Sequence, residues 1–234
     1  MVLPNFQLIQ AIKSGCLADF NAAMARGASP ESKDHDGRTA LQVALRHDQP
    51  DLGKRLIEDG ANPHGSIGSR GEHLIHLAVQ TADIGFVTVL LDAGVSASSI
   101  GNVCRTPLHI ASKRGLEYIA TALLDRGAGP NASDAQGNTP LHVAAKRGSL
   151  TMTRLLTTYN ANALVTNNQL YTPIHEAAAN GHTEVAKWLL NREHSHDSNF
   201  RVSGILQRVQ RVADRHNQAQ TSAELAKLGP TPIA

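Results

Sequence analysis

The chain has 234 residues, of which 41% are hydrophobic and only 3% aromatic. That length allows one or two globular domains, and the shortage of aromatic side chains favours stacked small helices over a β-sandwich. The formal net charge of +2 implies no particular partner. Two cysteines, Cys16 and Cys104, are too few for a disulfide framework, so we expect reduced thiols and a cytoplasmic or other intracellular location.

Two further classes of protein are disfavoured. No window approaches the roughly 18 consecutive apolar residues of a membrane span. Residues 1–12 lack the basic segment and following apolar run of a secretory signal. Delivery of a bacterial protein into a host cell stays open, because such a chain would read the same.

The predicted elements begin with two short helices within residues 6–28, one before Gly15 and one before Gly27. Five later segments repeat this rhythm of helix, break and helix, and four of them also close with Gly or Asn. The closing residues recur at intervals of 33 or 34 and are Gly27, Gly60, Gly94, Gly127 and Asn160. The interval indicates a repeat architecture built from one helical pair per unit.

A six-residue motif opens the later units. It reads Thr-Pro-Leu-His-Ile-Ala at 106–111, Thr-Pro-Leu-His-Val-Ala at 139–144 and Thr-Pro-Ile-His-Glu-Ala at 172–177, spaced by 33 residues both times. Looser copies stand at 39–44 and 73–78. Thr before Pro is a helix start, because the hydroxyl caps a free N–H and Pro loses no bond at the first helical position.

Each motif is expected to begin a short helix that a glycine ends. Gly115, Gly148 and Gly181 stand nine residues after the three Thr residues and supply a left-handed exit. A second helix follows, for example over 183–190, with a pair of Leu residues facing inward. A short polar stretch such as 133–138 then turns the chain into the next unit.

These motifs resemble the ankyrin-repeat family, in which about 33 residues form a β-turn and two helices. The resemblance covers roughly residues 5–194 and implies an all-α solenoid of stacked helix-turn-helix units with short β-turn tips. The expected division is an N-terminal capping repeat at about 5–30, followed by units starting near 34, 68, 101, 134 and 167, all within 1–194.

Some units depart from the pattern. The glycine positions that close the first helices of the second and third units hold Asp48 and Ala82. A left-handed Ala is strained by about 1 kcal/mol, so that exit is a candidate for rebuilding and these units are expected to be the loosest. The regular array ends at Glu193-His194, which replaces the Gly-Ala pair.

The C-terminal segment is expected to be a linker and one amphipathic helix over 195–217, followed by a mobile tail over 218–234. The helix places apolar residues at helical spacing over 202–216. One interpretation is a cap over the last repeat, which solenoids need. The alternative is a helix that binds a partner or a membrane surface.

Candidate chemistry is sparse, and we predict no enzyme activity, cofactor or metal. His76, His109, His142 and His175 stand at 33-residue intervals, but helices about 8–10 Å apart cannot bring equivalent side chains to one zinc ion. We expect each ring to bond local backbone and to bridge repeats. Three groups are weaker candidates for metal binding or reactivity. We interpret His194-x-His196-Asp197 as part of a solvated linker and His35-Asp36 as residues that stabilise a turn. We interpret Cys104 as an inert thiol.

The resemblance implies a binding face formed by the turn tips and the first helices. Positive charges dominate the positions that the family pattern exposes there, and only Asp36 and Glu72 oppose them. Val103 and Tyr171 could add apolar anchors at the tips. The predicted partner-binding residues are Arg38, Arg46, Arg70, Arg105, Lys113, Arg114, Lys146, Arg147, Val103 and Tyr171. Lys113-Arg114 and Lys146-Arg147 are equivalent in adjacent repeats, so four cations should cluster.

Three functions follow from this face. The leading hypothesis is a monomeric protein–protein adaptor that docks an acidic partner on a basic concave groove. A second is binding of nucleic acid or anionic lipid through the same face, against which stands the shortage of aromatic residues for base stacking. A third is an accessory or targeting subunit of an enzyme encoded elsewhere.

Overall fold

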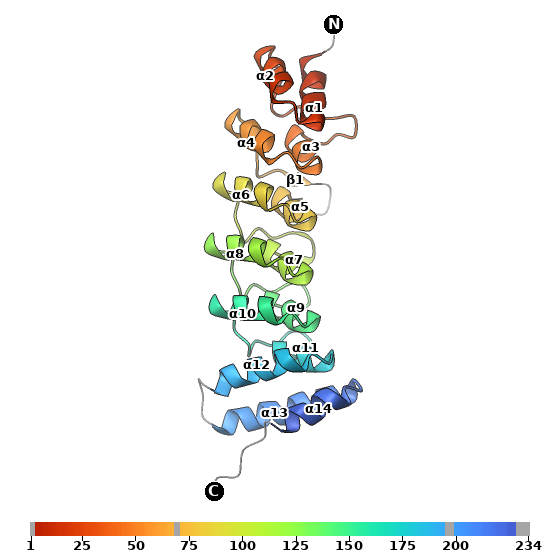
Figure 1. Ribbon diagram of the computed structural model, residues 1–234, viewed down its shortest axis with the longest axis vertical. Coiled ribbons are helices and arrows are strands. Elements are labelled where there is room, and N and C mark those ends of the chain that lie inside the picture. Colours follow the sequence, from red (N-terminus) through yellow and green to blue (C-terminus); the bar gives the residue numbers. More distant parts are fainter. Residues whose placement is uncertain (1–2, 68–70, 195–198, 228–234) are drawn as a thin grey trace. The chain divides into compact units, whose positions relative to one another are not determined.

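The computed structural model describes residues 3–67, 71–194 and 199–227, with side chains described outside 193–203. It is a helical solenoid of stacked helix-turn-helix units, as predicted (Figure 1). The chain divides into two compact units, Met1–Asn102 (unit 1) and Val103–Ala234 (unit 2), and each is considered by itself.

Unit 1 holds three helical pairs. Its helices are α1 (Pro4–Ser14), α2 (Leu17–Ala25), α3 (Ala40–Arg46), α4 (Pro50–Glu58), α5 (Leu74–Thr81) and α6 (Ile84–Asp92). A short hairpin precedes α5, in which β1 (Ser66–Ile67) pairs antiparallel with β2 (Glu72–His73). α1 packs against α2 and α3, and α4 packs against α6. The core side chains include Leu8, Ile12, Phe20, Leu41, Leu56, Ile75 and Phe86, all essentially inaccessible to solvent.

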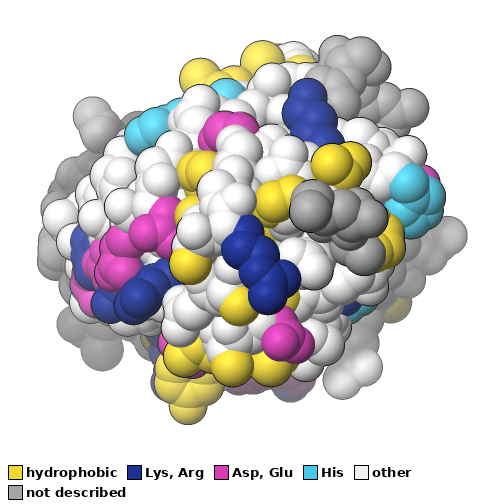
Figure 2. All heavy atoms as spheres, turned by 90° about the horizontal axis from the view of Figure 1, so that it is seen from above, with side chains coloured by type: hydrophobic (Ala, Val, Ile, Leu, Met, Phe, Trp, Pro, Cys, Tyr) yellow, Lys and Arg dark blue, Asp and Glu magenta, His cyan; other side chains and the backbone are white. Residues whose placement is uncertain are grey.

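The end of unit 1 that carries α1 and α2 exposes hydrophobic side chains among polar ones (Figure 2). Leu3, Phe6 and Leu17 are each more than half exposed there. A groove of about 450 Å³ crosses this end between Phe6 and Arg26. Its lining mixes glutamine, alanine and charged side chains, which is compatible with a solvent-facing cap.

Unit 2 opens with the 3₁₀ turn η2 (Asn102–Cys104), which begins at the last residue of unit 1, and continues as regular pairs. Its helices are α7 (Pro107–Arg114), α8 (Glu117–Asp125), α9 (Pro140–Arg147), α10 (Leu150–Thr158), α11 (Pro173–Ala179), α12 (Thr183–His194), α13 (Asn199–Arg215) and α14 (Ala219–Ala226). The first helices α7, α9 and α11 pack side by side, and the second helices α8, α10 and α12 form a parallel row (Figure 1).

The predicted helix boundaries follow the local chemistry. Thr139 is an N-cap whose backbone N–H donates to Nδ1 of His142, so histidine takes the third position of the capping box that Glu or Gln usually holds. Gly148 leaves the helix in the left-handed conformation with φ of 76°. Ala82 and Asp48 adopt the same conformation with φ of 64° and 54°. The exit at Ala82 is therefore kept and strained, not rebuilt.

The C-terminal segment forms one more helical pair. α13 packs on α11 and α12, and α14 packs on α12 and α13. Asn217 is left-handed, and the N–H of Gln218 donates to the carbonyl of Ala213 at 2.8 Å, as the N–H of His182 does to Ala177 at 2.9 Å. Residues 199–226 therefore reproduce the geometry of a repeat without its motif.

Helix α14 lies within 218–234, where the sequence indicated a tail. Thr221 and Leu225 are buried four residues apart and seat α14 on its neighbours. A stripe of one threonine and one leucine is too weak a pattern to predict from sequence alone.

Candidate protein-interaction surface

Four cations gather at the C-terminal ends of α7 and α9. We call Lys113, Arg114, Lys146 and Arg147 the basic cluster, and all four side chains are exposed. The Arg147 guanidinium donates to the backbone carbonyl of Lys113 across the repeat boundary, with Nη1 at 2.7 Å. That bond places the cations of adjacent repeats next to one another. The carbonyls at a helix C-terminus also favour positive charge, which stabilises the arrangement.

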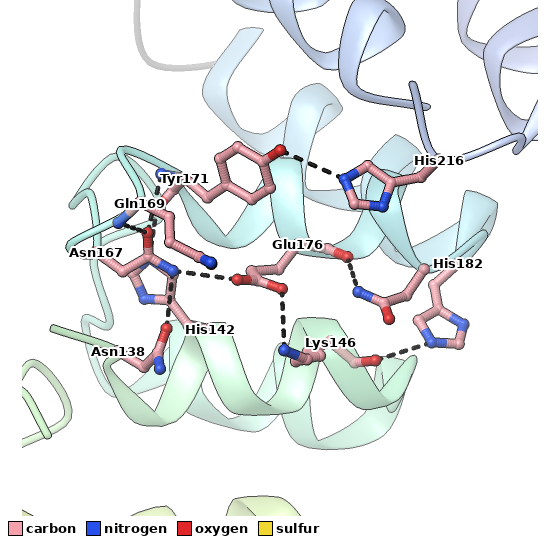
Figure 3. Close-up of polar contacts among 10 residues, drawn as sticks. Asn138, His142, Lys146, Asn167, Gln169, Tyr171, Glu176, His182 and His216 are labelled. Atoms are coloured by element: carbon pink, nitrogen blue, oxygen red, sulfur yellow. Dashed lines mark hydrogen bonds and ion pairs between the residues drawn. The ribbon is translucent and has the colours of Figure 1, made fainter. Parts of the chain in front are cut away.

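A buried carboxylate stands beside this cluster (Figure 3). Glu176 on α11 is only 4% exposed. Its Oε1 accepts from Nδ2 of Asn167 at 3.1 Å, and its Oε2 lies 3.9 Å from Nζ of Lys146. Lys146 is therefore partly neutralised, while Lys113 and Arg114 have no ion-pair partner among the described residues.

Glu176 was missed as an opposing charge when the face was read from sequence. It occupies the variable position of the six-residue motif, where the previous units hold Ile110 and Val143. An acidic residue at a position that is otherwise apolar was the available signal. Its burial depends on Asn167 and Lys146, which come from other segments of the chain.

The turn tips of unit 2 stack into a ridge. The N–H of Ala135 donates to the carbonyl of Val103 at 2.9 Å, and the N–H of Asn168 donates to the carbonyl of Gln136 at 3.0 Å. Inside the last tip, Oδ1 of Asn167 accepts the N–H groups of Gln169 and Tyr171 (Figure 3). Backbone hydrogen bonds between successive tips hold the exposed side chains in fixed relative positions.

Apolar side chains project from this ridge. Val103 is 42% exposed, and Leu170 is 77% exposed. Leu170 was not among the predicted partner-binding residues. Its position is left-handed, with φ of 62°, and Gly137 fills the equivalent position of the preceding tip with φ of 75°. A leucine that is both left-handed and exposed is unfavourable for the isolated fold.

Tyr171 has a more structural role than predicted. It is half-buried, and its ring stacks on His175 at a centroid distance of 5.9 Å. Its hydroxyl lies 3.4 Å from Nε2 of His216, at the end of α13. Tyr171 thus joins the last regular tip to the C-terminal helical pair.

The motif histidines bond local backbone, as predicted. Nε2 of His76, His109 and His142 lies 2.9–3.1 Å from the carbonyls of Ser99, Asn138 and Tyr171 respectively. Burial lowers the pKa of His109 and of His142, so both rings stay neutral near pH 7. His175 differs, because its Nδ1 contacts Thr172 but its Nε2 bonds no carbonyl among the described residues. No regular tip follows it to supply one.

Comparison with known proteins decides the family. The family model described as ankyrin repeats (3 copies) matches residues 8–102 and 108–201. The chain belongs to the ankyrin-repeat family. Ankyrin repeats are modules that bind other proteins, and the two matched ranges cover most of this array.

Similar curated proteins match shorter stretches. The chain is 34% identical over 92 residues to the ankyrin repeat protein FPV223 of fowlpox virus (strain NVSL), with 39% of this chain and 63% of that protein covered. It is 30% identical over 107 residues to the E3 ubiquitin-protein ligase KEG of Arabidopsis thaliana, covering 44% of this chain and 6% of the ligase. It is 32% identical over 89 residues to the BRCA1-associated RING domain protein 1 of Caenorhabditis elegans, covering 38% of this chain and 12% of that protein. The chain thus spans less than two thirds of each relative.

A solved structure shares the fold. The ankyrin repeat domain of Bcl-3, a member of the IkappaB protein family, superposes with a TM-score of 0.71 at 24% identity, covering 79% of this chain and 85% of that one. The likeness shows the ankyrin fold. Among the described residues, no helix is both long and apolar enough to cross a membrane.

The remaining predicted residues of this ankyrin-repeat protein differ in their local surroundings. Arg38 is neutralised by Asp36 at 2.6 Å and Asp34 at 3.5 Å. Arg46 is exposed at the end of α3, and Arg105 is half-buried before α7. Arg70 lies outside the described residues, as does the His196-Asp197 pair of the linker.

The predicted turn chemistry at His35-Asp36 centres on Asp34. Its Oδ1 accepts the N–H groups of Asp36 and Arg38, both at 2.9 Å, which lowers the pKa of Asp34 against the opposing effect of burial. The ligand atoms of Asp34, His35 and Asp36 lie within 4.8 Å of one another. Arg38 already pairs with both carboxylates, so the group is explained without a metal ion.

Proposed function

We propose that the protein is an adaptor that docks an acidic segment of a partner protein on the basic cluster of unit 2. The observation that carries this proposal is the bond from Arg147 to the carbonyl of Lys113, which joins the cation pairs of two repeats into one patch. Recognition would use a rigid surface with no chemical step and no cofactor.

The charge balance supports an acidic partner. Four cations face one buried carboxylate, so the patch keeps a clear excess of positive charge. Lys113 and Arg114 are exposed and have no ion-pair partner among the described residues, so binding an acidic group breaks no existing pair. Such a patch raises the rate of encounter with an oppositely charged surface and loses strength with added salt.

The tip ridge supplies the apolar part of the contact. Val103 and Leu170 project from it, and a partner that covers Leu170 would remove an exposed apolar side chain from water. Protein interfaces are stabilised mainly by such buried anchors, and charges set orientation and rate. A partner segment with both acidic and apolar residues fits this surface best.

Two other functions use the same patch. Binding of nucleic acid or anionic lipid would need only the cations. Tyr171, the predicted tip residue that could stack on a base, already stacks on His175. A role as an accessory or targeting module for an enzyme is compatible with the relatives, since two of them are named as a ubiquitin ligase and a RING domain protein. The test below separates the first from the adaptor function, and the second would appear as an enzyme among the proteins that the bait retains.

The test is a pull-down from nuclease-treated lysate at physiological salt with three baits. The baits are wild type, Lys113→Glu/Arg114→Glu, and the matched control Lys54→Glu/Arg55→Glu, which reverses two exposed cations on α4. Lys146 and Arg147 are left unchanged, because Glu176 and the Lys113 carbonyl depend on them.

A discrete protein retained by wild type and by the α4 control, and lost by the Lys113/Arg114 variant, supports the proposal. Equal retention by all three baits rejects the basic cluster as the docking site. Binding of unrelated polyanions that collapses between low and physiological salt favours the nucleic acid or lipid alternative.

A further inference from the structure

The helices α1 and α2 leave an open groove at one end of unit 1. Its floor contains Ala11 and Ala23, which are buried and too small to fill the space between the helices. About 450 Å³ therefore stays open on the side of unit 1 that Figure 2 views. We call the exposed rim of this groove the end face, and its residues are Phe6, Gln10, Asp19, Ala22 and Arg26.

The end face exposes more hydrophobic surface than a solvent-facing cap needs. Phe6 is 56% exposed on the rim, and Leu3, one helical turn before it, is 73% exposed. The terminal repeats of a solenoid usually have a polar outer side, since no further repeat covers them. An exposed phenyl ring beside an open groove indicates a surface that packs against another molecule.

Two opposite charges stand at the two ends of α2 on the same rim of the groove. Asp19 lies in the first turn of α2, and Arg26 is its C-cap residue. Their spacing of seven residues is two helical turns, so both side chains lie on one side of the helix, about 10 Å apart. Among the described residues neither has an ion-pair partner. Nη1 of Arg26 donates to Oε1 of Gln7 at 3.0 Å, which holds the guanidinium at the groove.

These features make the end face complementary to a reversed copy of itself. Ala22 lies midway between Asp19 and Arg26, and its small side chain allows a second helix to approach closely. When a second α2 lies antiparallel on the first with the two-fold axis near Ala22, each Asp19 meets the Arg26 of the other copy. The two helix dipoles then also run in opposite directions, which is favourable. Each Phe6 lies over the groove of the other copy in this arrangement.

We propose that the end face binds a second copy of this chain in a two-fold dimer, with the two α2 helices antiparallel and in contact at Ala22. Phe6 of each copy is the apolar anchor, and the two pairs of Asp19 with Arg26 fix the orientation. The interface is small, because α1 and α2 have only 11 and 9 residues. We therefore expect a weak dimer, with a dissociation constant of roughly 1–100 μM.

Charge complementarity selects a second copy over other occupants. A uniformly acidic or uniformly basic segment would meet one attractive and one repulsive charge along α2, at Asp19 and Arg26. A reversed copy of the same face meets two attractive charges, and like charges opposite each other would cost affinity. An anionic membrane surface meets the same conflict as an acidic segment, because the rim holds one anion for its one cation.

The dimer and the adaptor function are independent of each other, because the end face lies on unit 1 and the basic cluster on unit 2. A dimer would carry two basic clusters. It would therefore bind a partner with repeated acidic segments more tightly than one chain does, by raising the effective concentration of the second contact. Failure of the pull-down and absence of a dimer are separate results.

Analytical ultracentrifugation of the full chain at roughly 1–500 μM tests the proposal. The variants are Asp19→Arg, Arg26→Asp and Phe6→Gln, all at exposed positions. The matched control is Asp51→Arg, which reverses an exposed carboxylate in the first turn of α4. Circular dichroism checks that each variant is folded.

Wild type and the α4 control should dimerise alike, and each of the three variants should weaken the dimer at least about tenfold. An equal mixture of Asp19→Arg and Arg26→Asp should regain the dimer, because the reversed charge of each variant then faces its opposite on the other. The proposal is overturned if wild type stays monomeric over this range, or if the variants dimerise as wild type does. It is also overturned if the folded charge variants stay monomeric when mixed.

Discussion

The first helices of the repeats end at a left-handed residue in both units, but the backbone strain at that residue is lower in the regular repeats of unit 2 than in the irregular repeats of unit 1. α7 and α9 begin with Thr-Pro and end at left-handed glycines, whereas α3 and α5 lack the proline and exit through Asp48 and Ala82. Burial and the charge of Asp48 also raise the pKa of Asp83 in unit 1. Its Oδ2 is buried and has no hydrogen-bond partner among the described residues. The Thr-Pro and Gly positions of the motif therefore matter mainly because they avoid backbone strain, and the fold tolerates their loss in α3 and α5.

The largest effect is expected from removing a bridging histidine. His142→Ala leaves the N–H of Thr139 without its partner and the carbonyl of Tyr171 with only the N–H of Asn167, so the free energy of unfolding should fall by about 3 kcal/mol. His175→Ala is the matched control and should cost about half as much, because Nε2 of His175 bonds no carbonyl in the part of the chain that the structure describes. Urea denaturation followed by circular dichroism measures both. Equal losses would show that the bridge to the next tip adds nothing.

A smaller effect is expected when a regular exit is given a side chain. Gly148→Ala combines a left-handed alanine with a Cβ placed 2.4 Å from Nδ1 of His182, so the free energy of unfolding should fall by about 2 kcal/mol. Gly127→Ala is the control, since φ is 81° but no atom lies within 4 Å of its Cβ, and about 1 kcal/mol is expected. A Gly148 variant no worse than the Gly127 variant would contradict the steric argument.

The reverse change should stabilise unit 1. Ala82→Gly keeps the left-handed exit and removes its strain, so the free energy of unfolding should rise by roughly 0.5–1 kcal/mol. The same substitution at Ala78, buried inside α5 where the conformation is helical, should instead destabilise. Thermal melting of both variants shows whether each substitution raises or lowers the stability of the protein. Loss of stability in Ala82→Gly would mean that the exit carries no strain.

Mild acidification should give the smallest change and act through unit 2. Burial lowers the pKa of His109, His142 and His175 below the unfolded value near 6.5. The unfolded chain therefore binds more protons below that pH, so stability is full above about pH 6.5 and falls as the pH drops toward the folded-state pKa values. Denaturation midpoints between pH 7.5 and 5.5 test this in wild type and in His142→Gln, which should lose part of the slope. A midpoint that rises on acidification would contradict it.

Local features were predictable because they depend on short stretches of chain. The 33-residue period, the Thr-Pro helix starts and the exits at Gly115, Gly148 and Gly181 follow from capping and from φ preferences within one unit. The contact between the basic residues of α7 and α9 also followed, since equivalent positions in stacked repeats are neighbours. The sequence by itself thus determined the family, the helical pairs and the bridging role of His109 and His142.

Only the tertiary structure decided which charges are free and which side chains are covered. Glu176 is buried beside Lys146, and Arg38 is paired with Asp36. The Trp188 ring centre lies 6.0 Å from Cζ of Arg154 on α10 and 5.8 Å from Cζ of Arg192 on α12. α14 forms one more helical pair with α13, because Leu225 is buried where α14 packs on α12 and α13. The pairing and burial of these side chains depend on residues that the fold brings together from different repeats. A periodic pattern along the sequence carries little information about such contacts.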